Sequence, residues 1–309
     1  MIARLRGPDA GILLPFIIFT MIWGSTWIVI RDQLGSVSPH WSVTYRFIIA
    51  ALAMAAVAKW KGDSLRIDAT GLLVAGFLGF TQFCLNFNAV YLAERHITSG
   101  VVATVFALLL IPATLLGWAF LGQRPTARFA WSSLVAVAGI VLLFVHELQQ
   151  NPADAKQIAV GIGLTLLGMF AAASANVVQA RPEVRRFPLF GLLAWSMAAG
   201  ALIDAIIAFA MAGPPVLDSR PGYWLGLVYL AIPASVVTFS LYYPVVRKIG
   251  PAKASYSSVM VPIIAMGFST WIEGYRWTGL TIAGAVLALG GMAAALTRNR
   301  SPVAAPDAA

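Results

Sequence analysis

The sequence predicts an all-α integral membrane protein with about ten transmembrane helices. Of its 309 residues, 60% are hydrophobic and only 11% are charged, and the mean hydropathy is +0.82. Soluble domains carry about 25% charged residues, so this composition argues against a water-soluble fold. The second observation is a series of apolar segments of about 20 residues, the length that a helix needs to cross the hydrocarbon core. The third is an unequal distribution of basic residues between alternate connections.

The apolar segments are separated by short breaks that contain charged residues, proline or glycine. Backbone groups in lipid must be hydrogen-bonded within the segment, and these runs are too long for barrel strands, so each is predicted to be a helix. The first run is also too long for the apolar part of a signal peptide, and we interpret it as the first span. The predicted spans are 11–31, 40–59, 70–92, 97–121, 128–146, 158–181, 188–212, 222–246, 252–273 and 278–297.

Basic residues gather on one predicted side of the membrane. The N-terminus, the even-numbered connections and the C-terminal tail hold fifteen of them: Arg4, Arg6, Lys59, Lys61, Arg66, Arg124, Arg128, Arg181, Arg185, Arg186, Arg247, Lys248, Lys253, Arg298 and Arg300. The other side holds five: Arg31, Arg95, Lys156, Arg220 and Arg276. Cytoplasmic loops carry the excess of Lys and Arg, so the sequence predicts an inner-membrane protein with both termini in the cytoplasm.

Charge and cysteine content exclude several other classes of protein. The formal net charge is +9, but the basic residues form no contiguous stripe, which favours loops facing anionic lipid over nucleic-acid binding. Cys84 is the single cysteine, so no intramolecular disulfide and no thiolate metal cluster can form. We therefore predict no metal, no cofactor and no nucleic-acid partner; the expected partners are membrane lipid and a small-molecule solute.

The second half of the sequence echoes the first. Pro112 and Pro262 each lie eleven residues before a polar residue, Gln123 and Glu273, and the offset between the prolines is 262 − 112 = 150. Each copy would hold five helices, an odd number, so the copies must be inverted with respect to the membrane. The predicted organisation is a first repeat at 1–146, a linker at 147–157, a second repeat at 158–297 and a flexible cytoplasmic tail at 298–309.

With these motifs the chain resembles the drug/metabolite transporter superfamily and, within it, the EamA-type ten-helix permeases. The matching stretches are Trp23–Trp27, Tyr45–Phe47, Pro112–Thr126 and Pro262–Glu273. The resemblance implies two inverted five-helix repeats around a central cavity, and export or exchange of amino acids or related metabolites by alternating access. Gln123 departs from the glutamate that such sequences commonly carry at this position.

Polar residues within spans are candidates for the solute path, because such groups are costly unless they face protein or water. Spacings of four and five along the third span place Gln82, Asn86 and Tyr91 on roughly one face. Interhelical hydrogen bonding without any role in transport is the alternative for each of them. The further candidates for substrate binding are Trp23, Asn176, Trp195, Ser240 and Tyr243, of which the tryptophans could instead belong to interfacial aromatic belts.

Ionisable groups within spans are fewer. Arg46 in the second span and Asp204 in the seventh are both expected in the outer half of the bilayer, where each lacks a charged neighbour on its own helix. One hypothesis pairs them, either as a structural contact or as a gate. Another leaves Asp204 in a wet cavity, where it could couple transport to protons.

Prolines and small residues complete the prediction. Pro112 and Pro262 interrupt the fourth and ninth spans and are predicted to act as hinges, with passive kinks as the alternative. Gly222 with Gly226, and Gly284 with Ala288, predict close helix contacts. Contacts within a monomer are favoured, and a dimer stays possible.

Other functional classes fit the residue inventory less well. His40, His96 and His146 all lie near span ends and Asp204 is the one acid deep in a span, so an intramembrane enzyme lacks a catalytic dyad or a metal site. A channel remains an alternative, although nothing resembles a selectivity filter. Among transporters, a sugar-phosphate or nucleotide-sugar carrier would need several cations, and a multidrug exporter is the other alternative.

Overall fold

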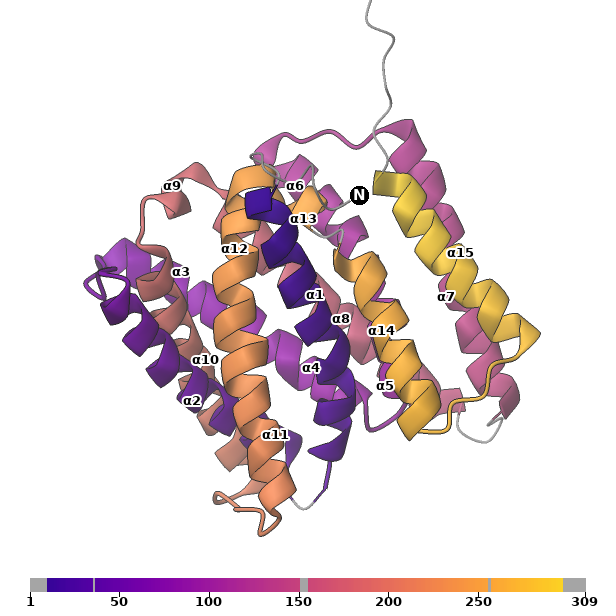
Figure 1. Ribbon diagram of the computed structural model, residues 1–309, viewed down its shortest axis with the longest axis horizontal. Coiled ribbons are helices and arrows are strands. Elements are labelled where there is room, and N and C mark those ends of the chain that lie inside the picture. Colours follow the sequence, from indigo (N-terminus) through magenta and orange to yellow (C-terminus); the bar gives the residue numbers. More distant parts are fainter. Residues whose placement is uncertain (1–9, 36, 151–154, 255–256, 297–309) are drawn as a thin grey trace, which may run out of the picture.

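In a computed structural model, the described residues 10–35, 37–150, 155–254 and 257–296 form helices and connections without a strand. Figure 1 shows long helices packed roughly along one direction, with α7 and α15 standing side by side at one edge of the bundle. The all-helical class is therefore confirmed for these residues. The predicted tail at 298–309 and part of the predicted linker lie outside them.

The described residues of the first half form nine helical elements. They are α1 (Ala10–Asp32), α2 (Pro39–Trp60), α3 (Ala69–Leu78), the π-helical segment η1 (Gly79–Leu85), α4 (Asn86–Ala93), α5 (Ser99–Phe106), the 3₁₀ segment η2 (Ala107–Leu109), α6 (Leu110–Leu121) and α7 (Ala127–Gln150).

The second half contains the other elements. They are α8 (Ala155–Ala180), α9 (Pro182–Arg185), α10 (Leu189–Ala212), α11 (Pro221–Ala231), the π-helical segment η4 (Ile232–Val237), α12 (Thr238–Ile249), α13 (Pro251–Ala254), α14 (Ser257–Ile272) and α15 (Gly279–Leu296).

Seven helices or helix runs of the described chain are long and apolar enough to cross a membrane. They are Leu14–Asp32, Pro39–Trp60, Ala69–Ala93, Ser99–Leu121, Ala155–Ala180, Leu189–Ala212 and Pro221–Ile249. Three shorter apolar stretches, Ala127–Leu143, Met260–Ile272 and Gly279–Gly291, overlap the predicted spans 128–146, 252–273 and 278–297. Many large apolar side chains remain exposed on the surface, as expected for helices that face lipid.

Local sequence explains where several helices begin and end. Asp68 precedes α3 and accepts a hydrogen bond from the Gly71 N–H at 2.7 Å, which satisfies one of the free donors of the first turn. Pro39 and Pro221 stand at the first position of α2 and α11, where a missing N–H costs nothing. Gly122 ends α6 with φ of 68°, a left-handed conformation that favours glycine.

Small residues allow the closest helix contacts. A Cβ built on Gly139 of α7 would lie 2.4 Å from the Ala288 backbone nitrogen, and one on Gly284 would lie 2.9 Å from the Gly139 oxygen. The predicted close contact at Gly284 and Ala288 is therefore confirmed, and it is made within the chain. Gly222, by contrast, has open space around it.

Candidate functional site

A central cavity lies where helices of the two halves meet. Its volume is about 100 Å³, several times the roughly 10–15 Å³ that one water needs by the same measure. The first half contributes lining residues from α1, α2, α4, α5 and the segments η1 and η2, and the second half contributes them from α8, α12 and α14. The cavity therefore has room for several water molecules, or for a small solute in their place.

Arg46 of α2 supplies the one charged side chain among the described residues that line this cavity. It is 1% exposed, and its Nε donates to the Ser235 hydroxyl at 3.1 Å. The guanidinium carbon lies 4.3 Å from the centre of the Phe87 ring, in cation–π contact, and the group also interacts with the Tyr91 hydroxyl. Its Nη1 has no hydrogen-bond partner within the described chain.

Three amide side chains, Gln82, Asn86 and Asn176, add to the polar surface of the cavity, which also includes Thr26 and Ser257. The Gln82 oxygen accepts from the Tyr243 hydroxyl at 3.5 Å, and the Asn176 nitrogen donates to the Tyr242 hydroxyl at 3.0 Å. The side-chain oxygens of Asn86 and Asn176 are buried without a partner in the described part of the chain. Because an unpaired buried acceptor is costly, these oxygens are suited to receive a donor from a bound solute.

Aromatic rings form much of the wall. The Trp23 ring lies 4.9 Å from Tyr242 and 5.6 Å from Phe239, both in edge-to-face arrangement, and its N–H donates to the Ala234 oxygen at 3.2 Å. Trp27 and Phe106 line another part, with ring centres 5.6 Å apart. The wall is thus rigid and largely apolar, which suits a solute with an apolar part.

The structure divides the predicted substrate-binding residues into two groups. Trp23, Gln82, Asn86 and Asn176 line the cavity. Tyr91 and Tyr243 are fully buried beside it, and Ser240 faces Met54; none of the three belongs to the lining. Trp195 lies apart, 44% exposed, with its N–H donating to the Leu65 oxygen at 2.8 Å. Its indole therefore contacts a connecting loop.

Arg46 and Asp204 do not pair in this structure. Asp204 accepts a hydrogen bond from the Asn88 amide at 2.6 Å, and the Asn88 oxygen lies 2.5 Å from His40 Nδ1. This chain of contacts joins α10, α4 and α2 outside the cavity lining. The pairing hypothesis fails here because the two side chains take different partners, while a role of Asp204 in coupling stays a prediction.

The predicted hinge prolines interrupt their helices differently. A turn of 3₁₀ helix at Ala107–Leu109 comes just before Pro112, which removes a backbone donor from α6. Pro262 lies inside the continuous helix α14. Their role in movement stays a prediction.

Four residues form a polar contact at the end of the bundle where α1 ends, which we call the Arg31–Glu273 junction: Arg31, Glu94, Ser99 and Glu273. Arg31 Nε lies 3.7 Å from Glu273, which accepts from the Ser99 hydroxyl at 2.6 Å. Arg31 also donates to the backbone oxygen of Glu94. The Glu94 side chain is fully buried, and neither of its oxygens has a hydrogen-bond partner in the described chain.

Burial and charge act together on Glu94, which lies one residue beyond the apolar run Ala69–Ala93. Burial raises the pKa of its carboxyl well above the usual value, the nearby Glu273 raises it further, and Arg31 opposes the shift. The junction connects α1, α4, α5 and α14. Packing of the bundle around this carboxyl therefore favours the protonated form of Glu94.

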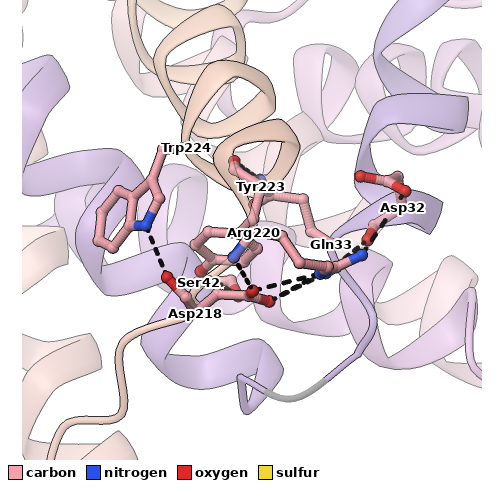
Figure 2. Close-up of polar contacts among 7 residues, drawn as sticks. All are labelled: Asp32, Gln33, Ser42, Asp218, Arg220, Tyr223 and Trp224. Atoms are coloured by element: carbon pink, nitrogen blue, oxygen red, sulfur yellow. Dashed lines mark hydrogen bonds and ion pairs between the residues drawn. The ribbon is translucent and has the colours of Figure 1, made fainter.

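A second polar cluster closes the same end between α1, α2 and α11 (Figure 2). Arg220 donates to both oxygens of Asp218, to Oδ2 at 2.9 Å and to Oδ1 at 3.2 Å, and its guanidinium lies 3.9 Å from Asp32. The Gln33 side-chain amide donates to the backbone oxygen of Tyr223 at 2.9 Å. Hydrogen bonding to Asp218 raises the pKa of Arg220, so this contact stays charged across the physiological range.

Sequence reasoning missed several cavity and junction residues. Trp27 could have been found, since it lies four residues from Trp23 on the same helix face. Glu94 and Glu273 also carried a signal, because both are acids at the ends of predicted spans that finish on the same side.

Comparison with known proteins decides the family. The model of the EamA-like transporter family matches residues 10–145 and again residues 159–297. The chain belongs to the EamA-like transporter family. The predicted membership is therefore confirmed, and the protein is a multi-pass membrane transporter of the EamA type.

Relatives of known sequence agree with this family, and a solved structure shares the fold. The uncharacterized inner membrane transporter YedA of Escherichia coli K12 is 28% identical over 259 residues, which cover 82% of this chain and 80% of the relative. A probable amino-acid metabolite efflux pump of the same strain is 24% identical over 291 residues, covering 89% and 91%. A solved crystal structure matches with a TM-score of 0.69 at 17% identity over 94% of this chain and 98% of the other, which is a likeness of fold.

Proposed function

We propose that this EamA-family protein exports or exchanges small organic metabolites, most of all amino acids or related compounds, across the inner membrane. The observation that carries the proposal is the central cavity, in which one cation, three amides and an aromatic wall gather from both halves of the chain. The similarity to a probable amino-acid metabolite efflux pump supports the substrate class. A single cation in the lining disfavours the sugar-phosphate and nucleotide-sugar alternatives.

The proposed architecture has ten spans in two inverted five-helix repeats, with both termini in the cytoplasm. Two matches of one family model support the duplication. The contacts of the repeat-related residues Gln123 and Glu273 support the inversion: Glu273 binds Ser99, and a Cβ built on Gly250 would lie 3.8 Å from Gln123. Gly250 and Gly100, the residue after Ser99, again differ by 150.

Under this topology the Arg31–Glu273 junction lies on the periplasmic side of the membrane, and the contact between Gln123 and Gly250 lies on the cytoplasmic side. Alternating access would then open one contact while the other stays closed. A channel does not need the two contacts to open in turn, and its flux does not depend on solute on the opposite side. Exchange kinetics therefore distinguish a transporter from a channel.

The decisive experiment measures exchange of labelled amino acids by the purified protein in proteoliposomes. Vesicles loaded with unlabelled solute should accumulate the labelled solute transiently, with and without a pH gradient. A panel that includes leucine, phenylalanine and threonine samples apolar and polar side chains. Absence of exchange for the whole panel would overturn the amino-acid proposal, whereas flux that does not saturate would favour a channel.

Replacing Pro112 by alanine should slow exchange several-fold if the fourth span bends during transport. Alanine restores the missing backbone donor, so the helix becomes straighter and stiffer before α6. The exchange rate and the KM should be measured together, with Pro125→Ala, a replacement in the connection after α6, as the control. Unchanged kinetics in Pro112→Ala would identify a passive kink.

A further inference from the structure

Arg46 is a buried cation without an acidic partner. None of the ion pairs among the described residues includes it, and no acid occurs among the described residues that line the cavity. Nε donates to the Ser235 hydroxyl, the Tyr91 hydroxyl also interacts with the guanidinium, and the Phe87 ring covers one of its faces. Nη1 is left without a hydrogen-bond partner in the described chain.

A charge in this position is costly unless an anion reaches it. Cation–π contact and two neutral hydroxyls compensate only partly for lost hydration, whereas a carboxylate can accept two parallel hydrogen bonds from a guanidinium. The cavity is adjacent and large enough for a small solute. With one cation in its described lining, the cavity matches a single negative charge better than a phosphate ester with two.

The opposite charge of a zwitterion also finds partners. The oxygens of Asn86 and Asn176 are buried, unpaired acceptors from α4 and α8, and a solute ammonium has three donors. Trp23, Trp27 and Phe106 then remain for an apolar side chain. The polar groups and the aromatic wall together match an amino acid better than an amine or a sugar.

We propose that Arg46 binds the carboxylate of the transported solute, which makes it the residue that selects carboxylates over amines. This inference rests on the proposed transport function and specifies its substrate class. The solute carboxylate, and not Asp204, would then neutralise the charge of Arg46.

The test compares three forms of one solute as competitors for exchange by the wild-type protein. They are the panel amino acid that exchanges fastest, its methyl ester and its deaminated acid; for leucine, the latter two are leucine methyl ester and 4-methylpentanoate. We expect the amino acid and the deaminated acid to compete, and the ester to be weaker by roughly 10- to 100-fold, the loss of a charge-assisted hydrogen bond. Equal competition by the ester would overturn the inference while leaving the transport function intact.

Variants locate this selectivity at Arg46. Arg46→Gln should lower affinity for the amino acid by a similar factor without weakening the ester, and Arg46→Lys should recover part of the loss. Arg66→Gln, at an exposed loop arginine, is the matched control and should behave as wild type. If Arg46→Gln retains the preference for the acid, the inference is wrong; if that variant does not fold, the wild-type comparison still decides. Absence of exchange by the wild type would instead contradict the proposed function.

Discussion

Glu94→Gln should make the Arg31–Glu273 junction insensitive to pH. In the closed structure Glu94 is buried beside Glu273, which raises its pKa, with Arg31 opposing. Opening would admit water and return the pKa towards its usual value. Protons therefore favour the closed form: the stabilisation is complete below the usual carboxyl pKa and is lost as pH rises through the raised value. Glutamine resembles the protonated acid and should keep the junction closed at all pH values.

The opening can be measured by the reaction of a cysteine with a membrane-impermeant maleimide. Thr98→Cys places the thiol in the connection before α5, in a Cys84→Ala background that removes the native thiol. Labelling should rise more steeply with pH when Glu94 is present than in Glu94→Gln. Because the thiol ionises in both proteins, comparing their pH profiles corrects for that ionisation. Parallel pH profiles in the two proteins would show that Glu94 does not control opening.

Gly139→Ala should separate α7 from α15 and lower the stability of the protein by about 1–3 kcal/mol, the usual effect of overpacking. The added Cβ would lie 2.4 Å from the Ala288 nitrogen and 2.5 Å from the Gly284 oxygen. Both are backbone atoms, so no side-chain rotation can relieve the contact. Gly291→Ala should act similarly, since its Cβ would lie 2.6 Å from the Ala136 nitrogen.

Gly290→Ala provides the matched control on the same helix. A Cβ there meets nothing within 4 Å, and alanine favours a helix over glycine by about 1 kcal/mol. Thermal unfolding in detergent should therefore show a lower midpoint for Gly139→Ala and Gly291→Ala, and an equal or higher one for Gly290→Ala. Equal midpoints for Gly290→Ala and Gly291→Ala would contradict the close packing of α7 and α15.

Hydropathy and spacing predicted the helices and part of the cavity. Gln82 and Asn86 are four residues apart and line it together, as their spacing indicated. Tyr91 is five residues beyond Asn86, which turns it about 140° away in an α-helix, and Val90 takes the lining position instead.

The remaining site depended on features that composition does not encode. Whether Arg46 meets Asp204 is decided by the rotation of α2 against α10. In this structure Asn88, which also contacts His40, donates to Asp204. The sequence alone allowed Trp195 to face either a cavity or an interface. Its contact with the loop at Leu65 depends on how that loop is placed, which the local sequence does not predict.

The two π-helical segments are places where these spans can lose a residue without a change in the cavity wall. A π turn accommodates about one residue more than an α turn, so a one-residue deletion within Gly79–Leu85 that restores α pitch leaves Asn86, Phe87 and Val90 facing the cavity. A deletion elsewhere between α3 and Asn86 that keeps the π turn would instead rotate these three residues by about 100° relative to α3. The same holds for Phe239 and Tyr242 after Ile232–Val237. Spans of related transporters could thus differ in length by one residue and still present the same side chains to the solute.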